Sequence, residues 1–224
     1  MGINVIVTGV TGMVGEGVLL ECLRNSQVDS VLAVCRKALD LPHPKLKVLV
    51  APDFLKIDAA TAQLTGYDAC FYCAGVSSNG VTEDDYTRIT YDTTLHFAAV
   101  ALQANPHIVF NFVSGNRADS SEQGRVMWAR IKGKTENALL KMFDGKEYNF
   151  RPALMRPVPG QKHFYGYNRW THKILYPVLS LVFPACSIEQ IAQAMINATL
   201  MGYEKPILEV RDIKTLAARL RPDI

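Results

Sequence analysis

The sequence predicts an α/β fold, a doubly wound parallel sheet, with a small C-terminal lid region. Apolar, β-branched runs alternate with amphipathic helical patterns up to about residue 157, which is typical of parallel strands joined by crossover helices. The first run ends in a glycine-rich turn that leads straight into a helical pattern. With 224 residues, 49% of them hydrophobic, the chain can form one substantial core. We expect a single domain over residues 1–224, in which residues 157–224 form the lid.

The expected first strand, residues 3–7, ends at a turn in which three glycines recur at intervals of three. The helix expected over residues 16–24 follows directly. A helix N-terminus presents unpaired N–H groups and a positive dipole end, and glycines let a pyrophosphate approach them. The turn therefore predicts a dinucleotide site; the alternative is a glycine-rich turn without a ligand. The expected contacts are Gly9, Thr11, Gly12, Met13, Val14 and Gly15.

A second strand is expected at residues 31–35, where a nicotinamide dinucleotide site reads the adenosine ribose. An acidic residue at this strand end would bind the 2′-hydroxyl of NAD. The sequence instead has Arg36 and Lys37, and two cations suit the 2′-phosphate of NADP. We therefore predict NADP as the cofactor, with NAD as the less favoured alternative because Asp40 lies nearby in sequence.

The third strand is expected at residues 46–50, and a short helix at residues 59–64, capped by Asp58, follows it. A fourth strand over residues 68–75 has small residues at its carboxyl end, which would let the backbone approach a ligand. The predicted ligand contacts of this part are Asp53, Phe54, Cys73, Ala74 and Gly75.

A capping-box spacing at residues 82–85 begins a long helix that is expected to run to Ala104. The fifth strand is expected at residues 107–113. The polar stretch 120–124 should be exposed and mobile, and residues 125–143 should form the next helix.

A short sixth strand is expected at residues 147–150, with residues 151–157 as its exit loop. After residue 157 the pattern changes, and prolines, glycines and aromatic residues follow. A second capping-box spacing begins a helix over residues 187–200. Residues 207–210 should form an edge strand, and Asp212 should open the terminal helix.

The apolar run at residues 174–183 is too short to span a bilayer and is broken by Pro177. We expect no membrane span. The run is interpreted as a lid helix or as a contact surface for a second copy or a partner protein.

Composition excludes several classes of function. The net charge of +3 comes from scattered basic residues, so no nucleic-acid partner is expected. Cys70 and Cys73 have C-x-x-C spacing, but on a strand they point to opposite faces, and the histidines show no metal-ligand spacing. We expect no metal. Because Met1 leads directly into the first strand without a signal sequence, we expect a cytoplasmic protein.

The chain resembles the atypical members of the short-chain dehydrogenase/reductase superfamily, which are epimerase-like, NAD(P)-binding Rossmann proteins. The resemblance covers essentially the whole chain. Its most specific parts are the turn at residues 8–15, the strand end at residues 73–75, Ser114, the helix bearing residues 132–136, and Arg151 with Pro152. Pro152 is accordingly expected near the cofactor.

The resemblance implies that Ser114 orients a substrate oxygen and that Lys132 binds the nicotinamide ribose. In that superfamily a tyrosine four residues before the lysine exchanges the proton with the carbonyl. This sequence has Trp128 there, and an indole N–H does not titrate. The proton-transfer residue of the pattern is therefore missing. The sequence leaves open whether water replaces it or one of Tyr86, Tyr91, Tyr165, Tyr167 and His163.

Two functions remain. The first is an NADP-dependent oxidoreductase for a small apolar carbonyl or sugar-like substrate, with an unusual proton donor. The second is a regulatory or interaction protein that binds NADP without turnover, which the tryptophan at position 128 favours.

Overall fold

The computed structural model describes residues 2–163, 176, 179 and 182–219. Its main sheet has seven strands in the order β3-β2-β1-β4-β5-β6-β9, and every neighbouring pair is parallel. The predicted doubly wound sheet is thereby confirmed, with the strand at residues 207–209 at its edge. The strands are β1 (Ile3–Thr8), β2 (Val28–Cys35), β3 (Leu46–Val50), β4 (Ala69–Tyr72), β5 (Val109–Val113), β6 (Glu147–Arg151) and β9 (Ile207–Glu209).

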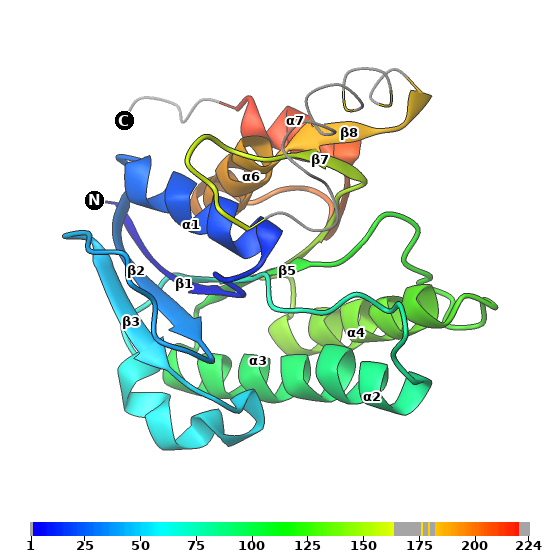
Figure 1. The fold of residues 1–224 in the computed structure, drawn as a ribbon, viewed down its shortest axis with the longest axis horizontal. Helices are drawn as coiled ribbons and strands as arrows, with labels where there is room; N and C mark the ends of the chain where they lie inside the picture. Colours follow the sequence, from blue (N-terminus) through cyan, green and yellow to red (C-terminus); the bar gives the residue numbers. More distant parts are fainter. Residues whose placement is uncertain (1, 164–175, 177–178, 180–181, 220–224) are drawn as a thin grey trace.

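Helices cover both faces of this sheet (Figure 1). One face carries α1 (Met13–Arg24), α6 (Ile188–Met201) and α7 (Val210–Ala217). The other carries the 3₁₀ helix η1 (Phe54–Leu64), α2 (Glu83–Thr87), the π-helical turn η2 (Arg88–Asp92), α3 (Thr93–Ala104) and α4 (Met127–Phe143).

Each face has its own hydrophobic core because side chains alternate along the strands. Val5 and Val7 of β1 pack in the core under α1, α6 and α7, whereas Ile6 between them packs in the core under η1, α3 and α4. The near-continuous apolar character of these strands follows from burial on both faces.

The long helix predicted up to Ala104 is present, with a π-helical turn in its middle. The Thr82 hydroxyl caps its start by accepting a hydrogen bond from the Asp85 N–H. At the π-helical turn the Thr93 hydroxyl donates to the Arg88 carbonyl over 2.8 Å. A π-helical turn adds a residue to the helix and changes which side chains face the sheet edge.

Several helix starts differ from the prediction, since α1 begins at Met13 rather than residue 16 and α4 at Met127 rather than residue 125. Asp58 does not cap a helix, because η1 begins at Phe54 and the Asp53 carboxylate accepts from the Leu55 N–H. Asp58 instead pairs with His96, at 2.8 Å. The last helix begins two residues before Asp212, which serves as the third helical residue of its capping box.

The exit loop predicted at residues 151–157 contains a strand. Residues 154–156 form β7 (Leu154–Arg156), which pairs in parallel with β8 (Ala185–Ser187) in a separate two-stranded sheet. The sequence of β7 is too short to show strand alternation, and its partner lies some thirty residues further on.

The stretch 120–124 has several exposed residues, and Asp119 accepts hydrogen bonds from the Ser121 and Gly124 N–H groups. The mobility of this stretch stays a prediction.

Much of the region 157–224 is part of the main fold, the sheet with helices on both faces, because α6 and α7 contribute to the hydrophobic core shared with α1 and β1. The apolar run 174–183 lies largely outside the described residues, so its role as a lid or contact surface stays a prediction. Two of its residues, Val182 and Phe183, are 76% and 54% exposed. In the described part of the chain no helix has the length and hydrophobicity needed to cross a membrane.

Candidate functional site

The turn between β1 and α1 needs two of its glycines for steric reasons. Gly9 has a φ of +68°, and a Cβ on it would lie 2.5 Å from the carbonyl carbon and oxygen of Cys73. Gly15 lies in the first turn of α1, and a Cβ there would lie 2.2 Å from the Gly9 carbonyl oxygen. The helix start therefore packs directly on the end of β1. That close approach brings the backbone of the turn to the side of the sheet where the strands have their carboxyl ends.

The start of α1 has free N–H groups because no side chain caps it. Gly12 is the N-cap residue, and α1 lacks a side-chain cap hydrogen bond there. The Gly12 N–H itself bonds to the Gly9 carbonyl at 2.8 Å, and the Glu16 N–H bonds to Gly12. The N–H groups of Met13 and Val14 have no acceptor inside the helix. Together with the helix dipole they form an anion-binding helix start.

This helix start lies at the position where the strand order of the sheet reverses, between β1 and β4. The Thr8 hydroxyl joins the two strand ends by accepting hydrogen bonds from the N–H groups of Cys73 and Ala74, each at 3.1 Å. In open parallel sheets the ligand crevice forms at such a reversal, beyond the carboxyl ends of the strands.

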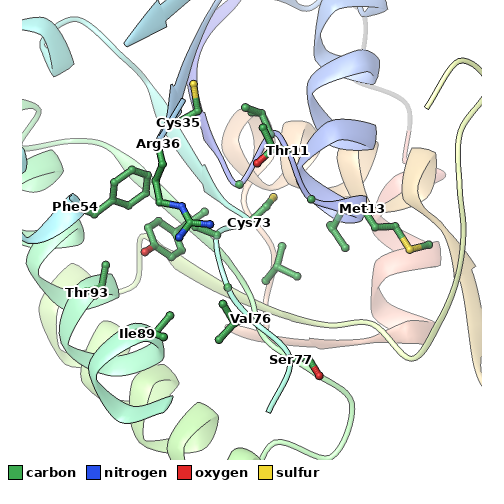
Figure 2. Close-up of a pocket in the computed structure, with 18 of the residues that line it drawn as sticks. Thr11, Met13, Cys35, Arg36, Phe54, Cys73, Val76, Ser77, Ile89 and Thr93 are labelled. Carbon is green, nitrogen blue, oxygen red and sulfur yellow. The ribbon is translucent and has the colours of Figure 1, made fainter. Parts of the chain in front are cut away.

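A cavity of about 1150 Å³ lies over this sheet edge (Figure 2). Most of the residues predicted for the site form its wall. They are Gly9, Thr11, Gly12, Met13, Val14, Arg36, Asp53, Phe54, Cys73, Ala74, Gly75, Ser114, Lys132 and Pro152. The structure thus brings together residues that lie more than 140 positions apart. Their roles toward a ligand stay predictions.

Three predicted site residues are not in the cavity wall: Gly15, Lys37 and Trp128. Gly15 acts through its packing on Gly9. Lys37 is exposed beyond the end of β2. Of the two neighbouring cations predicted to bind the 2′-phosphate, only Arg36 lines the cavity. The ring of Trp128 lies near Gly115, where an added Cβ would be 3.4 Å from its Cζ3 atom.

One end of the cavity is formed by the end of β2, the loop that follows β3 and the start of η1. In Figure 2 the Arg36 side chain extends alongside the ring of Phe54. Phe54 is buried and packs on Phe97, with ring centroids 5.2 Å apart. Arg36 is exposed and forms no ion pair with any residue that the structure describes. The Asp53 carboxylate is engaged as the cap of η1.

The opposite end lies at the carboxyl end of β5. The Ser114 N–H donates to the Phe150 carbonyl at 2.8 Å, which fixes the residue between β5 and β6. Its side chain is only 6% exposed, and its hydroxyl has no hydrogen-bond partner in the described structure. A buried polar atom without a partner is costly, so this hydroxyl is a candidate for contact with a ligand oxygen.

Lys132 is partly buried on α4 and faces the same end of the cavity. Its ammonium donates to the Val113 carbonyl at 3.2 Å and lies 5.2 Å from the centre of the Phe112 ring. Burial lowers the pKa of Lys132 to about 8, an effect that the nearby Glu136 carboxylate partly offsets. At a slightly alkaline pH the Lys132 side chain is therefore neutral in a large share of the molecules.

A buried ion pair supports the wall next to Pro152. Glu136 of α4 and Arg151 of β6 form a two-pronged pair, in which the Arg151 Nε donates to a Glu136 oxygen at 3.0 Å. Arg151 also donates to the Ser120 hydroxyl at 2.6 Å. This network joins α4 to the end of β6, so the helix that carries Lys132 is held against the sheet.

The cavity wall also contains residues that the sequence did not single out for the site. They are Val10, Val34, Cys35, Pro52, Leu55, Tyr72, Val76, Ser77, Asn79, Arg88, Ile89, Thr93, Val113, Gly115 and Met155. Many of them are sequence neighbours of the predicted strand ends, and this position alone could have identified them as candidate site residues. Ile89 enters the wall from the π-helical turn, which the sequence does not indicate, and Thr93 enters it from the first residue of α3 (Figure 2).

The described residues contain no cluster of histidine, cysteine and acidic side chains that could hold a metal. The described structure has no disulfide, and the cysteine side chains are free. Burial raises the pKa of the Cys70 and Cys73 thiols, so neither behaves as a reactive thiolate.

Comparisons with known proteins agree with this fold. The model of the NAD dependent epimerase/dehydratase family matches residues 5–135, more than half of the chain. "Protein HTATIP2" of Rattus norvegicus is 24% identical over 191 residues, which cover 80% of this chain and 78% of that protein. "Protein fmp52, mitochondrial" of Emericella nidulans is 26% identical over 159 residues, 68% of this chain and 66% of that protein.

Among solved structures, the Bordetella bronchiseptica enzyme WbmF in complex with NAD+ is similar, with a TM-score of 0.66 and 18% identity. The match covers 96% of this chain and 76% of WbmF. This likeness shows the fold. The family match and the fold together confirm the expected relationship to the short-chain dehydrogenases/reductases, and the chain belongs to the NAD dependent epimerase/dehydratase family.

Proposed function

We propose that the protein is an NADP(H)-dependent oxidoreductase of a small apolar carbonyl or sugar-like substrate. Family membership and fold support the coarser description, an NAD(P)-binding, oxidoreductase-like protein. The observation that carries the proposal is the uncapped start of α1 at the reversal of strand order, with the Arg36 side chain in the same cavity.

The residues present fit a dinucleotide. Glycine at positions 9 and 15 creates a close-packed turn that any Cβ would disrupt, and the free N–H groups of Met13 and Val14 suit a diphosphate. Gly75 has open space where a Cβ would be, so the β4 end leaves room for a ligand. The unpartnered Ser114 hydroxyl suits a ligand oxygen at the opposite end.

Within this proposal each wall residue has a simple task. Arg36 binds the 2′-phosphate of the cofactor, Phe54 packs beside the adenine, and Lys132 faces the nicotinamide ribose and the substrate. NADP(H), when bound, supplies or accepts the hydride. Ser114 orients the substrate oxygen. Val76 and Ile89 provide apolar surface at the substrate end of the cavity, which favours a small, weakly polar substrate.

The test is oxidation of NADPH by a panel of aldehydes, ketones, quinones and keto sugars. The steady-state rate is measured as the loss of NADPH absorbance. Turnover of at least one substrate, with NADPH preferred to NADH, supports the proposal. Retention of NADPH without any turnover supports the second function instead, an NADP-binding regulatory or interaction protein. A specific observation favours that second function, the absence of a tyrosine at position 128.

Trp128→Tyr distinguishes the two further. A gain of turnover in this variant shows that the remaining site is competent and that only the proton-transfer residue was missing. The chain is also proposed to form a single domain with residues 157–224 on its substrate side, and residues 174–183 are proposed as a contact surface for a second copy or a partner.

A cytoplasmic location is likewise proposed. Because one relative is named as mitochondrial, fractionation of cells is needed to test this location.

A further inference from the structure

Few groups in the cavity wall can exchange a proton near neutral pH. Burial raises the pKa of the Tyr72 hydroxyl and of the Cys35 and Cys73 thiols. Asp53 caps η1 at the far end of the cavity. Of the replacements that the sequence left open, Tyr86 and Tyr91 are outside the described wall, and so is His163, which pairs with Glu16; Tyr165 and Tyr167 lie outside the described residues. Lys132 remains as a cation at the inner end.

The geometry around Lys132 leaves it able to act on a ligand. One of its three N–H donors is used on the Val113 carbonyl, at 3.2 Å. The next residue along β5 is Ser114, whose hydroxyl is buried, in the cavity wall and without a partner in the described structure. An ammonium with spare protons and an unpaired hydroxyl thus belong to two residues that line the cavity at the carboxyl end of β5. A carbonyl oxygen placed there would receive a hydrogen bond from each.

We propose that Lys132 is the acid–base residue of this site, and that its ammonium gives the proton to a substrate carbonyl oxygen that the Ser114 hydroxyl holds. This inference rests on the proposed oxidoreductase function. Lys132 would then take over the step for which a tyrosine is absent at position 128.

The step balances with a reduced nicotinamide dinucleotide as the reductant. The carbonyl carbon gains a hydride with its electron pair, and the π pair of the C=O bond moves to the oxygen. That oxygen takes a proton from the Lys132 ammonium, which leaves a neutral amine and an alcohol. The amine regains a proton from water before the next turnover. In the reverse direction the neutral amine accepts the proton of the alcohol.

The surroundings of Lys132 explain why it can release a proton. Its desolvation disfavours the charged form, and the Glu136 carboxylate one turn along α4 favours that form. Glu136 offsets the desolvation only in part, because it is already paired with Arg151. The titratable or charged groups on the surrounding elements are Glu136, Arg151, Glu147, Arg88, Tyr72 and Cys73. Of these, Glu136 is the group whose charge shifts the pKa of Lys132, and Arg88 is another cation of the cavity wall.

Trp128 contributes apolar surface next to the lysine. A Cβ added to Gly115 would lie 3.4 Å from the Trp128 ring and 3.7 Å from the Lys132 Cδ atom, so both side chains meet the backbone of Gly115. The indole N–H does not titrate, so Trp128 does not compete with the lysine for the proton. The tryptophan thus has a use in the same site that lacks the tyrosine.

The first test compares Lys132→Arg with wild type. Arginine keeps the positive charge for cofactor binding but does not deprotonate in proteins. We expect the variant to bind NADPH within about threefold of wild type and to reduce the best substrate at least 100-fold more slowly, the lower range for general acid–base catalysis. Lys134→Arg is the matched control, because Lys134 lies on the same helix over the Tyr91 ring and outside the described wall. Retention of more than a tenth of the activity by Lys132→Arg overturns the inference.

The second test measures the proton directly. Two-dimensional NMR of protein carrying ¹³C at the lysine ε positions, with Lys132→Arg to assign the signal, should give Lys132 a pKa about two units below the other lysines. The kcat for reduction should fall as pH rises through the same value, and the kcat for alcohol oxidation should rise. An ordinary lysine pKa, or flat profiles between pH 7 and 9, contradicts the inference. Failure of wild type to bind NADPH would instead refute the proposed function.

Discussion

Replacing Arg36 by alanine should weaken NADPH binding and leave NADH binding unchanged. Arg36 lies in the cavity wall, is exposed, and forms no ion pair with a described residue, so its removal should take away the proposed ligand contact and little else. A hydrogen bond to a charged group contributes about 1.5–3 kcal/mol. Since the guanidinium keeps contact with solvent, the lower half of that range applies. About 1.5–2.2 kcal/mol corresponds to a loss of roughly 10- to 40-fold in affinity.

Isothermal titration calorimetry with NADPH and with NADH, at one fixed ionic strength, measures both affinities. Lys37→Ala is the matched control: it removes the neighbouring cation, which is exposed and outside the described cavity wall, and should change the NADPH affinity by less than about threefold. Two results would refute the reasoning. One is an unchanged NADPH affinity in Arg36→Ala. The other is an equal loss for NADPH and NADH, which would mean that Arg36 does not recognise the 2′-phosphate.

Three further changes test other parts of the structure. Gly15→Ala gains about 1 kcal/mol of helix propensity but places a methyl group 2.2 Å from the Gly9 carbonyl, so a net loss of about 1–2 kcal/mol and weaker NADPH binding are expected in thermal melts and calorimetry. Ser187→Ala removes the N-cap hydrogen bond of α6 to the Gln190 N–H and should cost about 0.5–2 kcal/mol in urea unfolding, with unchanged NADPH affinity. Burial raises the pKa of Glu147 far above its value in the unfolded chain, so the wild-type protein loses stability as pH rises above that lower value. Glu147→Gln should therefore be more stable than wild type at pH 8, by about 1–3 kcal/mol, and the difference should shrink toward pH 4.5; equal stability at pH 8 would contradict this.

The sequence predicted the sheet and most of its helices because their patterns depend on local chemistry. The turn at residues 8–15 is the clearest case, since Gly9 and Gly15 are required by contacts with Cys73 and with each other. The alternation of strands and helices then implied where strand ends meet, and Met13 and Pro152, although distant in the sequence, line the same cavity.

What the sequence missed depends on pairings that are distant in the chain or on small shifts of helix register. β7 needs β8 as its partner, and its three residues carry no pattern of their own. The π-helical turn, from which Arg88 and Ile89 enter the wall, has no sequence signature. The cap of η1 was misplaced because Asp53 and Asp58 are equally good capping residues, and tertiary packing of Phe54 decides between them.

The most direct test of the whole account is calorimetric titration of the folded wild-type protein with NADPH and with NADH. We expect one NADPH bound per chain, with a higher affinity than for NADH, because the proposed function assigns the diphosphate to the start of α1 and the third phosphate to Arg36. Uptake of neither nucleotide by a protein that melts cooperatively would contradict the account.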